Sequence, residues 1–291
     1  MENNIVFDRE RIYGHHTRDE VPEPGQFYLH THDCFEVYCF LSGDADYWVE
    51  GSVYHLSPGD LIINRSGESH RLLLRSTAPY ERISLHFDPS LLSGIDESAS
   101  LLVPFLSRPL GFANHYRAGD FPDGVYRSLL MKAVQDGSKS DSPDGKVRML
   151  CHLSAVLSEL YGVWEEQQIS RQPSQGEHPT ESDADPLAGE MIAYINENLF
   201  SDLSLPQIAA HFFLSQTYVS KRFVKATGIS VWNYVKIKRL HHARAAIRNG
   251  QSPHKVCFDC GYRDYSSFYR AYLSQFGVSP AKDKPEPAER N

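Results

Sequence analysis

A polar stretch, SRQPSQGEHPTESDADP (170–186), divides this chain of 291 residues into two parts of different character. Its only apolar residue is Ala184. A segment with so little apolar surface cannot offset the entropy lost on ordering, so we interpret it as a flexible linker. A chain of this length accommodates two or three domains of roughly 100–150 residues, so we expect at least one domain on each side.

The net charge of −8 is unevenly distributed along the chain. Residues 187–280 hold 11 Lys and Arg against 5 Asp and Glu, whereas residues 1–186 hold 15 against 29. The basic surplus predicts that only the C-terminal part meets the phosphates of a nucleic acid. No apolar run approaches the roughly 20 residues that span a bilayer, and the first residues lack the basic start and apolar core of a signal peptide. We therefore expect a cytoplasmic protein without a membrane partner.

The N-terminal part begins with a β-rich pattern and continues with a helical one. Short runs rich in β-branched and aromatic residues fill residues 26–88, among them FYLHTH (27–32), and Gly, Pro, Ser or Asp separates them. Many short strands on this spacing predict a barrel or sandwich. Further on, apolar residues from Met149 to Trp164 form a broad helical stripe. We expect one side of this stripe to cover the β-domain and the other to contact a second copy, giving a homodimer through helices in 120–166.

Two segments of the C-terminal part repeat one pattern, a short helix, a tight turn and a longer amphipathic helix. Ser204 and Ser215 are placed to cap the helices of the first segment. In the second, Ser252-Pro253 starts the short helix and Asp264 caps the longer one. This is the pattern of the helix-turn-helix motif, whose second helix enters the major groove of DNA. A helix of about 18 residues, and so about 27 Å long, lies between the two segments. Because neighbouring grooves repeat about every 34 Å, this connector is of the right length for two recognition helices.

The two segments and their connector also match a specific set of residues across about 95 positions. The matching residues are Leu205, Ile208, Ala209, Phe212, Leu214, Ser215, Tyr218, Ser220, Phe223, Lys225, Thr227, Gly228, Tyr234, Arg239, Ala243, Gly261, Tyr262, Asp264, Ser266, Phe268, Arg270, Gly277, Ser279 and Pro280. In these positions the chain resembles the AraC-type transcription regulators. It departs from their pattern at Val256-Cys257 and at Asp283-Lys284. The resemblance implies that Cys257 and Cys260 pack in the core rather than forming a redox or zinc site.

The resemblance further implies which side chains meet DNA. The expected contacts are Gln216, Thr217, Ser220 and Lys221 on the first recognition helix and Tyr265, Ser266, Tyr269 and Arg270 on the second, with Arg222, Lys225 and Arg263 placed for phosphates. Arg270 can bond the edge of a guanine through two hydrogen bonds. Phosphate contacts position the protein without reading sequence.

A second resemblance lies in the β-rich part. His30, His32 and Glu36 have the same parity, so on an extended chain they face one side, and His70 follows on a later strand after Pro58-Gly59-Asp60. This spacing is similar to that of the cupin barrel, although Arg65 and Leu74 depart from it, and AraC-type regulators often carry such a barrel. The resemblance implies that His30, His32, Glu36 and His70 converge inside it. Further candidates to line the pocket are Tyr38, Trp48, Arg71 and His86.

These four residues leave three interpretations open. Three imidazoles and a carboxylate suit Mn, Fe, Ni or Zn. The same groups can instead bond a small polar effector directly, which we favour, or serve the fold alone. We therefore expect no required cofactor, with a divalent metal at His30, His32, Glu36 and His70 as the alternative.

Together these features predict an α+β multidomain protein. Residues 1–169 form a cupin-like sensing and dimerisation domain, with a barrel at about 20–90 and helices at about 90–166, followed by the linker 170–186, a tandem helix-turn-helix domain 187–281 joined by a long helix, and a polar tail 282–291. The predicted function is a sequence-specific transcription activator, not an enzyme. Its expected partners are an operator in double-stranded DNA, RNA polymerase and a small effector, for which we expect a carbohydrate. The alternatives are a metal-dependent cupin isomerase or dioxygenase, and a DNA-binding regulator whose barrel serves only dimerisation.

Overall fold

The computed structural model describes residues 4–9, 11–23, 26–139, 143–170 and 185–283, and their contacts divide the chain into two units. The first, the N-terminal unit, comprises Met1–Tyr28 and Cys34–Asp183, and the second, the C-terminal unit, comprises Leu29–Asp33 and Ala184–Asn291. Most of the predicted linker, residues 171–184, lies outside the described part. No helix in these described ranges is long and apolar enough to cross a membrane.

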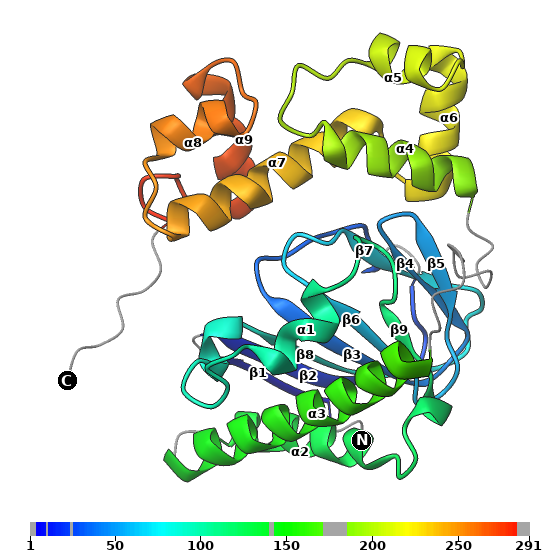
Figure 1. The fold of residues 1–291 in the computed structure, drawn as a ribbon, viewed down its shortest axis with the longest axis vertical. Coiled ribbons are helices and arrows are strands. Elements are labelled where there is room, and N and C mark those ends of the chain that lie inside the picture. The colour runs from blue at the N-terminus through cyan, green and yellow to red at the C-terminus, as the bar shows by residue number, and fades with distance from the viewer. Residues whose placement is uncertain (1–3, 10, 24–25, 140–142, 171–184, 284–291) are drawn as a thin grey trace. The chain divides into compact units, whose positions relative to one another are not determined.

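The predicted β-domain is confirmed in the N-terminal unit (Figure 1). Its strands are β1 (Ile5–Arg9), β2 (Ile12–Asp19), β3 (Phe35–Ser42), β4 (Ala45–Val49), β5 (Ser52–His55), β6 (Leu61–Asn64), β7 (His70–Leu74), β8 (Tyr80–Phe87) and β9 (His115–Tyr116). One sheet has the order β1-β2-β8-β3-β6-β9 and the other β5-β4-β7, with every paired strand antiparallel.

Two expectations about the strands are wrong. The sheet begins at Ile5, well before the expected start near residue 20, because β1 and β2 pair with each other and β2 pairs with β8. The run FYLHTH (27–32) is not a strand, since the chain bends at Asp33 and Cys34 and regular pairing starts only at Phe35. The parity argument for His30, His32 and Glu36 therefore fails, because it requires one extended segment.

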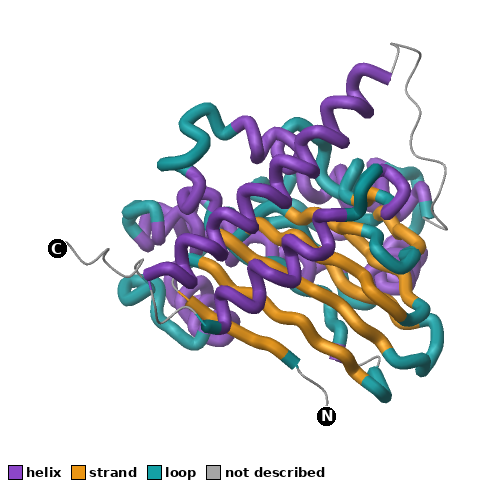
Figure 2. Tube along the Cα trace, turned by 90° about the horizontal axis from the view of Figure 1, so that it is seen from below, coloured by secondary structure: helices purple, strands orange, loops and turns teal. Residues whose placement is uncertain are grey.

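Helices cover one face of the larger sheet (Figure 2). They are α1 (Val103–Leu106), α2 (Val125–Ser138) and α3 (Pro143–Ser170), with short 3-10 turns at Pro89–Leu92, Ser100–Leu102 and Ala118–Asp120. From α3, Met149, Leu153, Val156 and Leu160 are buried in one core with residues of α2 and of the sheet. Most of the apolar stripe is therefore used within the chain, whereas Val147 on the same helix is exposed.

The C-terminal unit is helical, as predicted. Its helices are α4 (Pro186–Glu197), α5 (Leu205–His211), α6 (Gln216–Thr227), α7 (Val231–Arg248), α8 (Pro253–Asp259) and α9 (Tyr265–Phe276). The expected caps form at three positions, where Ser204, Ser215 and Asp264 each accept a hydrogen bond from a backbone N–H three residues further on. Ser252 precedes α8 without a side-chain cap. The connector α7 has 18 residues, the expected length.

The core of this unit explains one expectation and corrects two. Cys257 and Cys260 are buried beside Phe268 and Tyr272, as the resemblance implied. The amphipathic pattern of the first longer helix predicts that Tyr218 points inward, but on α6 this side chain is exposed. The unit also extends beyond residue 281. Asp283, assigned to the polar tail, is buried and accepts hydrogen bonds from Arg244, Arg248 and Tyr272.

Candidate effector site and nucleic-acid interface

Strand register places one polar set on the face of the large sheet opposite the helices. Val37, Leu85 and Ile63 point toward the helices and belong to the core there. Because side chains alternate along a strand, Glu36 on β3 faces the other way, together with its register partners Asn64 on β6 and His86 on β8. We call this side the inner face.

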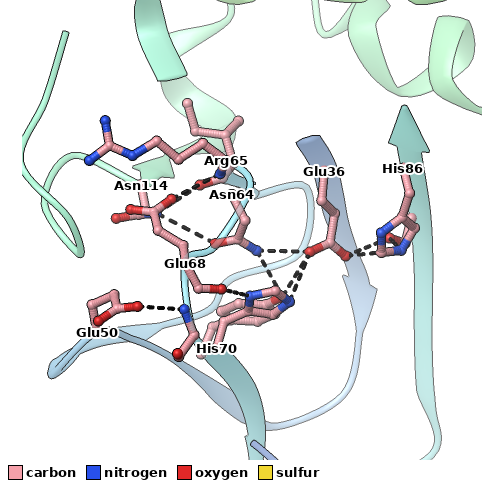
Figure 3. Close-up of polar contacts among 12 residues, drawn as sticks. Glu36, Glu50, Asn64, Arg65, Glu68, His70, His86 and Asn114 are labelled. Carbon is pink, nitrogen blue, oxygen red and sulfur yellow. Dashed lines mark hydrogen bonds and ion pairs between the residues drawn. The ribbon is translucent and has the colours of Figure 1, made fainter. Parts of the chain in front are cut away.

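Glu36 is the centre of the polar cluster on the inner face (Figure 3). Its carboxylate is 4% exposed and accepts hydrogen bonds from the Ser84 hydroxyl at 2.6 Å and the Asn64 amide at 2.8 Å. The Nε2 atoms of His70 and His86 lie 3.3 and 3.5 Å from its two oxygens. A single buried carboxylate thus accepts from a hydroxyl and an amide, with two imidazole nitrogens close by.

A hydrogen bond to the backbone fixes the orientation of the His70 ring. Its Nδ1 lies 2.8 Å from the backbone carbonyl of Glu68, and because a carbonyl only accepts, Nδ1 carries the proton of this hydrogen bond. Nε2 is then turned toward Glu36, and the ring stacks on Tyr47 at 5.9 Å between centroids. A histidine held in this way presents a defined ring nitrogen to a ligand or metal.

A buried ion pair supports the loop that carries His70. The guanidinium of Arg108 bonds both carboxylate oxygens of Glu68, at 2.7 and 2.8 Å, and Glu68 is fully buried. The same carboxylate accepts from the backbone N–H groups of Arg65 and Gly111. Sequence reasoning did not single out Glu68 or Arg108, which lie 40 residues apart, because such nonlocal pairing leaves no local pattern.

The structure brings together some of the predicted pocket residues. Glu36, His70 and Tyr38 share the N-terminal unit, and Tyr38 lies on the inner face with its hydroxyl 2.6 Å from that of Tyr80. Trp48 follows Tyr47 on β4 and therefore points to the opposite side of that strand. His30 and His32 lie in Leu29–Asp33, the short segment whose contacts group it with the C-terminal unit, and their ring centroids are 6.1 Å apart.

Strand β2 adds residues that the sequence reasoning missed. Tyr13 and His15 pair in register with His86 and Ser84, so both face the inner side, and their rings lie 5.6 Å apart. Burial and the nearby Arg82 guanidinium lower the pKa of His15 to about 4, which keeps this imidazole neutral at pH 7. The signal available was the alternation in β2, but no motif marked it.

The two recognition helices present matching surfaces in the C-terminal unit. On α6, Gln216, Thr217, Lys221 and Lys225 are exposed and Ser220 is partly buried. On α9, Ser266, Tyr269 and Arg270 are exposed and Tyr265 is partly buried. Both helices have 12 residues and a capping side chain before the first turn. Most of the predicted base-reading residues therefore have exposed side chains.

Two residues expected to contact phosphates have partners within the chain. Arg222 lies 2.6 Å from Asp185, the residue that caps α4, and donates to the hydroxyl of Tyr218. Arg263 lies 2.5 Å from Asp202, and both side chains are 81% exposed. Arg222 is therefore less available to a phosphate than Lys225.

Exposed apolar side chains at equivalent positions of the two recognition helices were also missed. They are Val224, the ninth residue of α6, and Leu273, the ninth residue of α9. An apolar side chain on such a face can contact the methyl group of a thymine. The signal was present in the sequence, since both lie three residues after the basic residue at positions 221 and 270.

Comparisons with known proteins agree with both units. A model for an AraC-like ligand binding domain matches residues 14–143, and a model for a helix-turn-helix domain matches residues 208–284. The melibiose operon regulatory protein of Escherichia coli K12 is 21% identical over 86% of this chain and 81% of its own length. The transcriptional activator RhaS of Escherichia fergusonii is 27% identical over 88% and 87%. ToxT of Vibrio cholerae, a solved structure, covers 93% of this chain and 96% of its own, with 12% identity and a TM-score of 0.37.

A tandem helix-turn-helix unit with exposed basic helices, preceded by a ligand-binding β-domain, defines a DNA-binding transcription regulator and not an enzyme. The matching domains and relatives identify the family. The chain belongs to the AraC family of transcription regulators.

Proposed function

We propose that this regulator is an activator that responds to a neutral polyhydroxylated molecule, a carbohydrate, bound at the inner face of its N-terminal unit. The observation that carries the proposal is the Glu36 cluster, where a buried carboxylate meets hydroxyl, amide and imidazole groups. Such a set both donates and accepts, which is what sugar hydroxyls require. A regulator of a melibiose operon among the relatives supports the same class of effector.

The charges of the site favour a neutral effector over an anion. Glu36 supplies a negative charge, and the imidazole of His15 is neutral at pH 7 because its pKa is lowered to about 4. Arg82, the nearby cation, is 2.6 Å from Asp19 and is thereby compensated. The rings of Tyr38 and Tyr47, 4.8 Å apart, add an aromatic surface of the kind that packs against the C–H face of a sugar.

A divalent metal is the alternative occupant of this site. Glu36 and His70 fit the donor types that such ions take, and the hydrogen bond from His70 to the Glu68 carbonyl is typical of a ligating histidine. A bound ion would add positive charge beside Glu36 and offer hydroxyl oxygens a Lewis acid. We favour direct binding because Ser84 and Asn64 already satisfy both carboxylate oxygens.

The remaining parts of the proposal concern assembly and location. As an activator, the protein would contact RNA polymerase at an operator, in the cytoplasm where that DNA lies. We also propose a homodimer through helices in 120–166, with the exposed Val147 on α3 as a contact. Sedimentation of the full chain as a dimer at micromolar concentration is expected, and a monomer would overturn this part.

The test of the site uses the purified full chain. Elemental analysis reports divalent metal, and calorimetry with a panel of neutral mono- and disaccharides reports binding. We expect a metal-free protein that binds one sugar, and at least about a tenfold loss of affinity in Glu36→Gln. Glu159→Gln, on the exposed side of α3, is the matched control. Near-stoichiometric metal that Glu36→Gln removes would establish the alternative, and no binding by any sugar would favour a domain that serves only dimerisation.

A further inference from the structure

Arg239, in the middle of α7, bonds three backbone carbonyls. Its Nε donates to the carbonyl of Leu199 at 2.7 Å, Nη2 to that of Ser201 at 2.8 Å, and Nη1 to that of Gly261 at 2.8 Å. Leu199 and Ser201 belong to the segment between α4 and α5, which leads into the first helix-turn-helix motif. Gly261 lies in the turn between α8 and α9, in the second motif. One side chain therefore connects the two motifs.

Other contacts hold the segment between α4 and α5 against α7 and against the second motif. Phe200 lies edge-to-face with His242 of α7, at 5.1 Å between ring centroids. Asp202 lies 2.5 Å from Arg263, two residues beyond Gly261. We call the contacts of Arg239, Phe200 and Asp202 with the turn and with α7 the brace. Without the brace, α7 would be the main connection between the two recognition helices.

The turn of the second motif is built to allow this close approach. Gly261 has φ +77°, a conformation that side chains disfavour. A Cβ atom there would lie 2.9 Å from the Arg239 guanidinium carbon and 2.9 Å from the carbonyl oxygen of Phe200. The corresponding turn of the first motif has Phe213 at φ 56°, with an exposed side chain. Close contact with a neighbouring segment therefore distinguishes the second turn from the first.

The chemistry of the brace requires arginine. Burial lowers the pKa of Arg239, so placing its charge here carries a desolvation cost. The three hydrogen bonds offset this cost, and they follow the fixed, forked geometry of a guanidinium. A lysine keeps the charge, but its ammonium group is compact and cannot reproduce three donors spread over one plane. With its guanidinium engaged in this way, Arg239 acts inside the unit rather than on phosphates.

We propose that Arg239 is a positioning residue that fixes the second recognition helix relative to the first, and thereby sets the spacing of the two half-sites that the protein reads. The proposal rests on both α6 and α9 entering DNA. One inserted base pair rotates the second half-site by about 34–36° and moves it by about 3.4 Å. A braced pair of helices cannot follow this change without strain, whereas an unbraced pair can.

The test uses the full chain and a DNA duplex selected by the wild-type protein from a random-sequence pool. Affinity is measured for this duplex, for one with a base pair inserted between the half-sites, and for one with a single half-site. We expect Arg239→Lys to bind the selected duplex about tenfold more weakly, with little change on the single half-site. Its preference over the inserted duplex should nearly vanish. The salt dependence of binding should stay unchanged, since the charge is kept.

Two further variants separate positioning from folding. Arg248→Lys makes the same exchange on α7 at a residue paired with Asp283, and should retain the spacing preference. Asp202→Asn removes the exposed part of the brace and should reduce that preference without changing the melting temperature. The proposal is overturned if Arg239→Lys folds and keeps the full spacing preference. If Arg239→Lys does not fold, the same result for Asp202→Asn overturns it. A wild-type protein without spacing preference would instead show that only one helix reads DNA. This result would refute the premise that α6 and α9 both enter DNA, and with it the proposal for Arg239.

Discussion

Two buried carboxylates, one in each unit, are equally shielded and differently used. Glu36 and Asp283 are both 4% exposed. Asp283 accepts from two guanidinium groups and the hydroxyl of Tyr272, whereas Glu36 accepts from a neutral hydroxyl and a neutral amide. Permanent cations around Asp283 hold helices together, while the groups around Glu36 are ones that a ligand hydroxyl can exchange with. Burial alone therefore does not identify a site, and the partners do.

The largest effect that follows from this contrast is on stability. We expect Asp283→Ala to lower the free energy of unfolding of the C-terminal unit by about 2–3 kcal/mol. This value lies at or below the roughly 3–5 kcal/mol of a fully buried broken pair, because Arg244 and Arg248 remain partly exposed. The loss in unfolding free energy is measured by urea denaturation, with DNA binding as the signal that reports unfolding. Glu36→Gln should lower the unfolding free energy of the N-terminal unit by less than about 1 kcal/mol. Equal losses of stability in Asp283→Ala and Glu36→Gln would contradict the difference between the two carboxylates.

The pH dependence of stability sharpens the same comparison. Burial alone would raise the pKa of Asp283, but the hydrogen bonds from Tyr272, Arg248 and Arg244 outweigh it and lower the pKa. A carboxylate with a lowered folded-state pKa contributes stability that is complete above its usual value of about 3.9 and is lost as the pH falls through the folded value. The difference between the wild type and Asp283→Asn should be constant above pH 5 and shrink below pH 4. A difference that grows on acidification would contradict this account.

The same distinction, between side chains paired within the protein and side chains available to a ligand, can be tested on an arginine of the DNA-binding face. Arg270 is exposed on α9, and Arg270→Ala should cost about 1–3 kcal/mol on a selected duplex and relax the preference at one or two bases. Binding to random DNA should fall much less. Equal losses on selected and random duplexes would show that Arg270 contacts a phosphate rather than a base.

The smallest expected effect compares Lys225 with Arg222. Lys225 is exposed, so Lys225→Ala should weaken all sequences alike and reduce the salt slope by about one. Arg222→Ala should reduce the slope by less, because Asp185 already compensates the Arg222 charge. Salt titrations of both variants on random DNA decide this. If Arg222→Ala instead reduced the salt slope by about one, DNA would have to displace Asp185 from Arg222.

Local signals explain why the C-terminal unit was predictable from sequence. Ser204, Ser215 and Asp264 act within three residues of themselves, and each forms the expected cap. The length of α7 follows in the same way from one periodic stretch. Asp283 was misplaced because its partners on α7 lie 35 and 39 residues away, and Tyr218 was expected inward although it is exposed.

The N-terminal site depended on contacts that no local pattern encodes. Glu36 and His70 were singled out correctly as members of one unit, but the parity argument that joined His30 and His32 to them assumed a strand where the chain has none. The set around Glu36 comes from β3, β6, β7 and β8, and register alone decides which residues face it. Register is set by pairing between distant strands, so Asn64 and Ser84 could not be foreseen, whereas His86 was a candidate from sequence.

The central claim is that the Glu36 cluster receives the effector while the C-terminal unit binds DNA. The most direct measurement is the affinity of the full chain for a selected duplex, with and without the sugar that binds the wild type, compared with Glu36→Gln. We expect the sugar to change the affinity of the wild type and to leave that of Glu36→Gln unchanged, with equal affinities of the two proteins when no sugar is present. A Glu36→Gln protein that responds to the sugar like the wild type would contradict the claim.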